Sequence, residues 1–253
     1  MKLHAVWISN PGHHNWISLR GVEWFLLLFG LAALDTYIWI NASTVLDQVY
    51  ADWAFDERLR GLAPSPQGFA FDEIRALLGR DQPKPETAEP AALASKSEPL
   101  SVVRPPNTKP PAPSEVIGRL EIPNLHLTAM VREGADTGTL RRAVGHIPGT
   151  ALPGTTGNVA LAGHRDTFFR ALRNIQTNDA IELQTESGTY RYLVESIRIV
   201  GPRDVRVLAS SKGATLTLVT CYPFYYIGSA PKRFIVRAAL ATAVPQRELA
   251  LGH

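Results

Sequence analysis

The sequence predicts a small all-β barrel or sandwich of seven to eight short strands, preceded by an apolar helix and a proline-rich linker. Within residues 115–243, short runs that alternate apolar and polar residues are separated by turns rich in Gly and Pro. Residues 22–40 are almost continuously apolar, whereas residues 62–114 are crowded with proline.

The apolar stretch at residues 22–40 is predicted to be a transmembrane anchor. A helix of that length is just able to cross a hydrocarbon core of roughly 30 Å. Trp24 lies at one end, and Tyr37 and Trp39 lie at the other, as interfacial aromatic anchors do. The helical pattern continues through the juxtamembrane residues 41–61.

The flanking charges predict the orientation of this anchor. Lys2 and Arg20 lie in the N-terminal tail, residues 1–21, whereas four acids follow the anchor, namely Asp47, Asp52, Asp56 and Glu57. The positive-inside rule then places the tail in the cytoplasm and the bulk of the chain outside the cell membrane.

Two other interpretations of the apolar stretch stay open. Asp35 within a spanning helix is costly, although it lies near the outer end. Residues 24–34 have the length of a signal-peptide core, with a weak small-residue site at residues 41–43. A buried helix of a soluble protein is the third possibility.

Residues 62–114 are predicted to be a semi-extended linker without a core of its own, because closely spaced prolines interrupt ladders and long helices. One apolar island within it predicts a local helix over residues 72–78. Residues 244–253 are predicted to be a frayed tail.

The folded domain is predicted to start near Val116 and to end at residue 243. Its predicted strands are residues 116–122, 125–131, 158–162, 181–184, 189–200, 215–221 and 233–240, and its helical stretches are residues 139–144, 167–172 and 203–208.

Composition excludes several classes of function. The net charge is only +3, and no dense block of Lys and Arg indicates nucleic-acid binding. The single cysteine excludes an intramolecular disulfide framework and argues against a thiolate metal site. The acids Glu133, Asp136, Asp166 and Asp179 are scattered and form no compact oxygen-ligand loop, so no metal site is predicted and calcium dependence stays open. No cofactor is predicted.

The only thiol, Cys221, ends the strand-like run at residues 215–221. Pro223 cannot donate a ladder hydrogen bond, so pairing should fade just past the cysteine and leave the sulfur at the lip of a strand. A nucleophilic cysteine needs a base or a cation beside it, because the thiolate is the reactive species.

His164 and Arg233 are the predicted partners of this thiol. His164 ends the strand-like run NVALAGH, whereas His126 and His146 lack a comparable position at a strand end. Arg233 opens the strand after Cys221, and Arg237, Lys232 and Arg165 are its rivals as the cation near the sulfur. Strand alternation places residues 233, 235 and 237 on one face.

At these residues the chain resembles the sortases, cysteine transpeptidases of the bacterial envelope. The resemblance rests on TLVTC with an arginine twelve positions on, and on LAGHRDTFFR upstream. The segment YPFYYIGSAPKRF indicates the class D type. The resemblance covers residues 116–239 and implies a sortase β-barrel, with Cys221 as nucleophile, His164 as general acid and base, and Arg233 as oxyanion stabiliser.

The resemblance also implies a reaction. A protein substrate with a C-terminal LPxTG-like sorting signal would be cleaved after threonine, and its acyl group transferred to an amine. Two alternatives stay open: a hydrolytic cysteine peptidase that uses the same residues, and a catalytically silent envelope protein that binds a peptide or a wall component.

Overall fold

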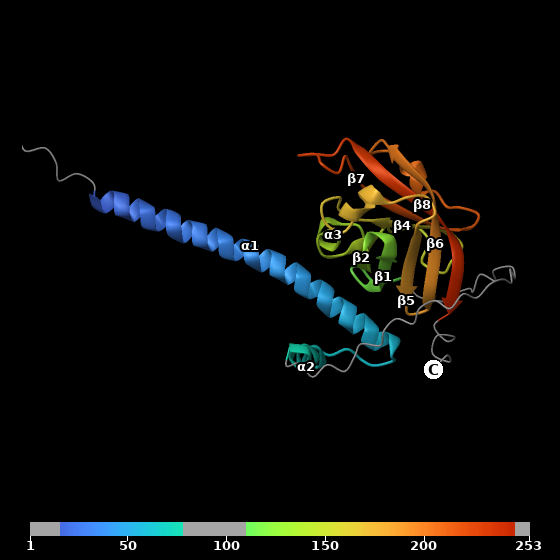
Figure 1. Cartoon of the computed structure of the whole chain (residues 1–253), viewed down its shortest axis with the longest axis horizontal. Coiled ribbons are helices and arrows are strands. Elements are labelled where there is room, and N and C mark those ends of the chain that lie inside the picture. Colours follow the sequence, from blue (N-terminus) through green and yellow to red (C-terminus); the bar gives the residue numbers. More distant parts are fainter. Residues whose placement is uncertain (1–15, 78–109, 246–253) are drawn as a thin grey trace, which may run out of the picture. The chain divides into compact units, whose positions relative to one another are not determined.

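The computed structural model describes residues 16–77 and 110–245. Within them, eight strands close into one barrel in the order β1-β2-β3-β4-β7-β8-β6-β5 (Figure 1). The strands are β1 (Val116–Ile122), β2 (Leu127–Glu133), β3 (Val144–His146), β4 (Gly157–Ala162), β5 (Ala180–Thr185), β6 (Gly188–Val200), β7 (Ala214–Tyr222) and β8 (Lys232–Pro245). The predicted all-β fold is therefore confirmed, and it is a barrel.

The pairing of β4, β7 and β8 positions the residues of interest. β4 runs parallel to β7, with Ala162 opposite Val219. β7 and β8 are antiparallel, with Cys221 opposite Arg233. The end of β4, the end of β7 and the start of β8 therefore meet at one edge of the barrel.

Alternate residues of these strands fill the barrel interior. On β7 the inward positions include Leu216 and Leu218, and on β8 they include Phe234 and Val236, all within the buried core cluster. Arg233 and Arg237 alternate to the outer face and are half-buried. Because side chains alternate along a strand, Cys221 also lies on the outer face.

The second strand begins two residues later than predicted. Residues Pro123–Leu125 form a 3-10 turn (η1), and His126 then adopts a left-handed conformation with φ 49°. The His126 N–H donates to the carbonyl of Pro123 and closes this turn. Residue 125 is therefore part of the turn, and β2 starts at Leu127.

The third strand was not predicted. The helix predicted over residues 139–144 is α3 (Thr137–Arg142), because Asp136 caps it by accepting hydrogen bonds from the amides of Gly138 and Thr139. The Thr139 hydroxyl also donates to Asp136. This bond has the largest effect, and together with the amide bonds it holds the pKa of Asp136 below its usual range. The chain leaves the helix directly into β3, whose three residues are too few to show an alternation.

Three other elements differ from their predicted bounds. The helix predicted over residues 167–172 is a run of turns followed by the 3-10 helix η2 (Arg170–Asn174). The predicted helical turn at 203–208 is η3 (Val205–Leu208). The last strand continues past residue 240 to Pro245, because its partner β6 is long enough to pair as far as Gly188.

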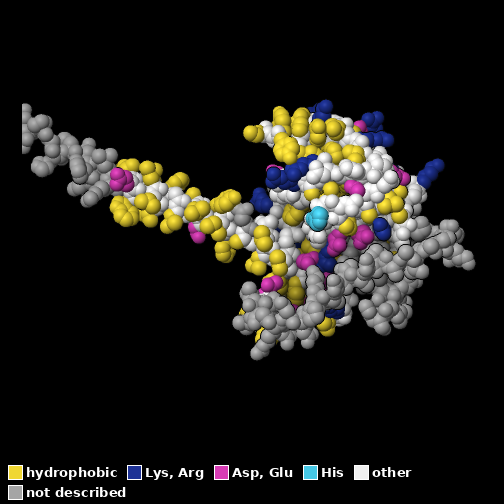
Figure 2. All heavy atoms as spheres, viewed as in Figure 1, with side chains coloured by type: hydrophobic (Ala, Val, Ile, Leu, Met, Phe, Trp, Pro, Cys, Tyr) yellow, Lys and Arg dark blue, Asp and Glu magenta, His cyan; other side chains and the backbone are white. Residues whose placement is uncertain are grey.

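Helix α1 (Trp16–Leu59) contains the predicted anchor. The chain divides into two compact units between Val45 and Leu46, and each is described by itself. In the first unit the large apolar side chains between Val22 and Trp39 are exposed (Figure 2). Among the described helices only α1 is long and apolar enough to cross a membrane, and its best window has a mean hydropathy of 1.6.

In the second unit, the last turns of α1 pack against β1 and β2. Phe55 is 1% exposed and forms a cluster with Ala51 and Met130. The guanidinium of Arg119 lies 5.4 Å from the centre of the Phe55 ring. The pattern of Val45, Val49 and Trp53 predicts this helical segment. Val45 and Val49 are exposed, whereas Trp53 is half-buried.

Ion pairs surround this apolar contact. Arg119 donates to Asp52 at 2.6 Å and to Asp56 at 2.7 Å, and Arg132 donates to Asp47 at 3.1 Å. Burial alone would lower the pKa of Arg119, but its carboxylate partners outweigh this effect and raise it. Three of the four acids that follow the anchor thus bind the barrel.

Helix α2 (Pro66–Leu77) covers the neighbouring surface of α1. Phe69 contacts Tyr50 and Trp53 edge-on, with ring centres 5.3 and 5.6 Å apart. The helix begins six residues before the predicted position because Ser65 caps it, with its hydroxyl accepting from the Gly68 amide. Residue 78, the predicted end, lies outside the described residues.

We expect Phe55→Ala to lower the free energy of unfolding by about 3 kcal/mol, since it empties a buried site between α1 and β2. Urea unfolding of the detergent-solubilised chain, followed by tryptophan fluorescence, measures this loss. Phe71→Ala is the matched control: Phe71 is 72% exposed, and its loss should change the stability by less than about 0.5 kcal/mol. Equal stabilities of the two variants would show that α1 contributes little to the fold.

Candidate active site

Cys221 is the penultimate residue of β7 and is partly accessible to solvent. Its inward neighbours are anchored: Thr220 is buried, and Tyr222 packs against Phe224 and Phe234 at the end of the core. The sulfur therefore stands on a rigid strand end and faces outward, where a ligand can reach it.

His164 follows β4 by two residues and is half-buried. The Gly163 amide donates to the carbonyl of Val219 at 3.1 Å, and the Thr220 hydroxyl donates to the carbonyl of Gly163 at 2.7 Å. These bonds continue the β4–β7 register beyond the end of β4. The register thereby brings His164 level with Cys221.

The segment after His164 is held by its own aromatic residue. Phe169 is fully buried in the core, and its amide donates to the carbonyl of His164 at 3.0 Å. A Cβ atom at Gly163 would lie 2.7 Å from the Phe169 ring, so only glycine fits before the histidine. The glycine in LAGH and the second phenylalanine in DTFF therefore fix the backbone of His164 together.

Arg233 is the register partner of Cys221, as predicted from its position at the strand start. Its guanidinium here donates to the carbonyls of Ala230 and Lys232, at 3.2 and 3.0 Å. Both bonds come from Nη1, and the role of Arg233 toward an oxyanion remains a prediction.

The rival cations are placed differently. Arg237 is the partner of Thr217, four residues down β7 from the cysteine, which corresponds to roughly 13 Å along the strand. Lys232 pairs with Tyr222, and its side chain alternates to the opposite face from Arg233. The guanidinium of Arg165 is bound to carbonyls of the loop between β7 and β8.

His146 was judged to lack a position at a strand end, and this judgement is wrong, since it is the last residue of β3. It is only 2% exposed. Its Nδ1 lies 2.7 Å from a Glu133 carboxylate oxygen, and its Nε2 lies 3.0 Å both from the Ala151 carbonyl and from the Thr150 hydroxyl. Both ring nitrogens are engaged, so the imidazole joins structural elements.

A buried amide network lies on the outer face of β4 and β7. Asn158 is 1% exposed, and its Oδ1 accepts from the hydroxyls of Thr217 at 2.7 Å and Thr215 at 3.3 Å. Its Nδ2 donates to the carbonyl of Val207 in η3 at 3.1 Å. Asn158 therefore ties the β6–β7 loop, residues 201–213, to the sheet.

The acids considered for a metal site are mostly engaged elsewhere. Asp136 caps α3, Glu133 binds His146, and Asp179 accepts from the side chain of Asn124 at 2.7 Å. In the β6–β7 loop, hydrogen bonds from Arg206 hold the pKa of Asp204 below its usual range. Over residues 16–77 and 110–245, no group of three or more His, Cys, Asp or Glu side chains is arranged to hold a metal ion.

We expect Asn158→Ala to lower the free energy of unfolding by about 1–3 kcal/mol, because it leaves the buried Thr217 hydroxyl and Val207 carbonyl without this partner. Urea unfolding measures the effect, and proteolysis within residues 201–213 should accelerate in parallel. Asn174→Ala, at an exposed position, is the control. A loss no larger than that of the control would mean that the amide network does not hold the loop.

Comparison with known proteins finds similar domains. Residues 120–241 match the family model described as the sortase domain. The chain is 35% identical over 127 residues to Sortase D of Bacillus subtilis, covering 50% of this chain and 64% of that protein. It is 28% identical over 110 residues to Sortase A of Listeria monocytogenes, covering 42% and 49%. The chain thus spans less than two thirds of the length of these curated relatives.

A solved structure has the same fold. The SrtA sortase from Actinomyces oris superposes with a TM-score of 0.52 and 29% sequence identity, over 57% of this chain and 89% of that one. The family model is the comparison that gives a residue range, and its residues 120–241 contain the strand ends described above.

Proposed function

We propose that this chain, whose residues 120–241 form a domain of the sortase family, is a cysteine transpeptidase that acts on a sorting signal. One observation carries the proposal: Cys221 and Arg233 are register partners at the edge of the barrel where the strand that leads to His164 also ends. The residues proposed as nucleophile, proton carrier and hydrogen-bond donor thus belong to strand ends at one edge of the sheet.

In the proposed first half-reaction, the Cys221 thiolate attacks the carbonyl carbon of threonine in an LPxTG-like motif. A carbon–sulfur bond forms, and the peptide carbon–nitrogen bond breaks when the His164 imidazolium donates a proton to the leaving amine. In the second half-reaction an amine attacks the thioester, His164 accepts its proton, and the thiolate leaves. The acyl group has then moved from one amine to another.

Arg233 would stabilise the negative charge on the carbonyl oxygen during both steps. In the described structure its guanidinium donates to Ala230 and Lys232. These are neutral carbonyls, and an oxyanion is a stronger acceptor for a guanidinium. Catalytic hydrogen bonds often form only in the substrate complex, so the present orientation is compatible with the proposed role.

We expect Cys221→Ala to lower the rate of peptide cleavage by at least about 1000-fold, because the nucleophile is lost. Arg233→Ala should lower kcat by about 100- to 1000-fold, as the loss of an oxyanion donor does. The measurement is mass spectrometry of LPxTG-type peptides incubated with the chain, with and without a small amine. It should show a thioacyl adduct on Cys221 in the wild type.

Each alternative function predicts a different product. Diversion of the acyl group to the added amine identifies a transpeptidase. Cleavage that ignores the amine identifies a hydrolytic peptidase with the same site. The absence of any cysteine-dependent reaction with a peptide would identify a binding protein. Arg237→Ala is the control for Arg233→Ala, because it removes a positive charge from the same strand.

The proposal includes the location of the enzyme. The exposed apolar face of α1 supports a single-pass anchor through residues 22–40, and the Lys2 and Arg20 charges support a cytoplasmic N-terminus. The catalytic domain would then act outside the cell membrane, where proteins that carry sorting signals arrive.

The single thiol makes this topology testable. A membrane-impermeant maleimide added to intact protoplasts or spheroplasts should label the chain at Cys221 to the same extent as after lysis. The Cys221→Ala variant should stay unlabelled in both samples. Labelling that appears only after lysis would place the barrel in the cytoplasm and overturn the proposed location.

A further inference from the structure

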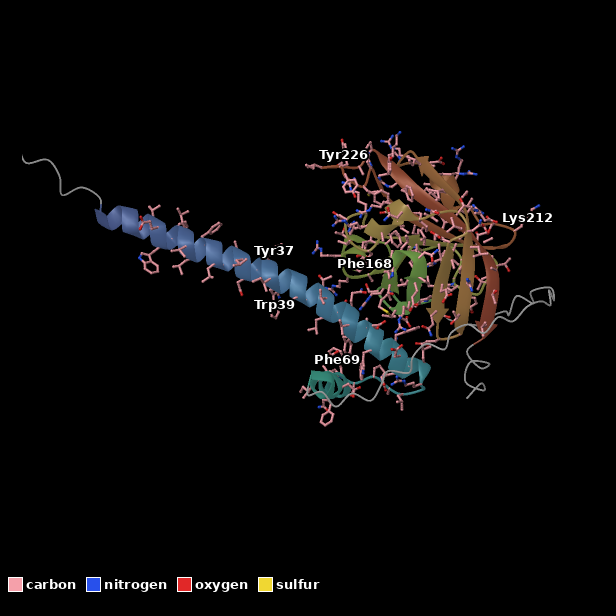
Figure 3. The ribbon with its side chains drawn as sticks, in the orientation of Figure 1. Tyr37, Trp39, Phe69, Phe168, Lys212 and Tyr226 are labelled. Atoms are coloured by element: carbon pink, nitrogen blue, oxygen red, sulfur yellow. The ribbon has the colours of Figure 1, made fainter. Side chains whose placement is uncertain are left out.

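The loop that follows the cysteine exposes its apolar side chains. This β7–β8 loop, residues 223–231, carries Tyr225, Tyr226 and Ile227, which are 78%, 45% and 100% exposed. Figure 2 shows hydrophobic side chains gathered there beside Lys and Arg side chains, and Figure 3 labels Tyr226 on this loop. Burial of these side chains in the core therefore does not hold the tip of the loop in place.

The side chain of Arg165 holds the β7–β8 loop by hydrogen bonds to backbone carbonyls of that loop. Its Nη1 donates to the carbonyl of Pro223 at 2.9 Å, and its Nη2 donates to the carbonyls of Tyr226 at 2.5 Å and Gly228 at 3.2 Å. Its guanidinium also lies 5.8 Å from the centre of the Tyr226 ring. A planar fork of five N–H groups can satisfy three carbonyls on one loop, which a compact ammonium does less well.

A second arginine supports the same loop. Arg173, in η2, donates to the hydroxyl of Tyr225 at 2.7 Å and lies 5.6 Å from the centre of its ring. Both arginines belong to the segment after His164, and the loop belongs to the segment after Cys221. The contacts therefore join the two segments that carry the proposed proton carrier and nucleophile.

The start and the end of the loop have contacts of their own. Phe224 packs against Phe234 of the core, and Arg233 donates to the carbonyl of Ala230 at 3.2 Å. Between them, Arg165 is the residue that binds the backbone of the loop at Tyr226 and Gly228.

We propose that Arg165 is a positioning residue that holds the β7–β8 loop in one conformation beside Cys221, so that the sorting peptide meets a preformed wall. This role rests on the proposed function. The loss of Arg165 should weaken peptide binding because the loop must then be ordered by the substrate itself. The reactivity of the thiol toward a small electrophile should be preserved, because the bonds that place Cys221 and His164 lie within the barrel.

The test compares the full chain with Arg165→Gln and Arg165→Lys, and Arg170→Gln is the charge control, because Arg170 is an exposed arginine of the same segment. Chymotrypsin cleavage after Tyr225 and Tyr226, located by mass spectrometry, reports whether the loop is held. Arg165→Gln should be cut at least about tenfold faster than the wild type, since bonds to a charged donor are lost. Arg170→Gln should be cut at the wild-type rate.

Kinetics supply the readout that a purely structural role would not give. For an LPxTG-type peptide, Arg165→Gln should raise KM about tenfold and change kcat by less than about threefold. Alkylation of Cys221 by iodoacetamide should keep the pH dependence of the wild type. Arg165→Lys should resemble Arg165→Gln, because it keeps the charge and loses the fork.

Three results would overturn the inference: wild-type cleavage by chymotrypsin in Arg165→Gln, full recovery in Arg165→Lys, or a kcat loss with unchanged KM. If the wild type cleaves no sorting peptide, the proposed function fails instead. The chymotrypsin and alkylation measurements would then still decide whether Arg165 holds the loop.

Discussion

The parallel register between β4 and β7 is the constraint on which the candidate site depends. A parallel pair brings two strand ends to the same side of a sheet, and the antiparallel β8 then returns to that side. His164, Cys221 and Arg233 are distant in sequence, yet each is within two residues of a strand end at this edge. Closure of the barrel makes the register rigid, because a slip by one residue would move every core side chain to the outer face.

The acids at the end of α1 have two physical roles. As charges they follow an apolar stretch that Lys2 and Arg20 precede, and the positions of these two basic residues predict which end of the helix leaves the cytoplasm. As hydrogen-bond acceptors, Asp52 and Asp56 bind Arg119 on β1, and Asp47 binds Arg132 on β2. These ion pairs surround the buried Phe55, so polar and apolar contacts join the same turns of α1 to the barrel.

Local sequence predicted much of the fold and the site, because these signals depend on near neighbours. The alternation before Cys221 and the glycine turn around His164 are visible in a few residues. The three-residue β3 could not be predicted, since it exists only through pairing with β2 and β4. The hydrogen bonds from Arg165 to the β7–β8 loop could not be predicted either. Their acceptors are backbone carbonyls more than fifty residues along the chain, and every residue type has a backbone carbonyl.

Because β3 is short, the number of paired residues between neighbouring strands differs around the barrel. This strand offers three pairs to β2 and two to β4, so the ladder is thinnest between those neighbours. His146 stabilises this region because its side chain hydrogen-bonds both to Glu133 on β2 and to Thr150 in the turn after β3. The shortest ladder of the barrel therefore adjoins β4, the strand that leads to His164. Local opening of this ladder would reach the edge that carries the candidate site through a strand that contributes no residue to that site.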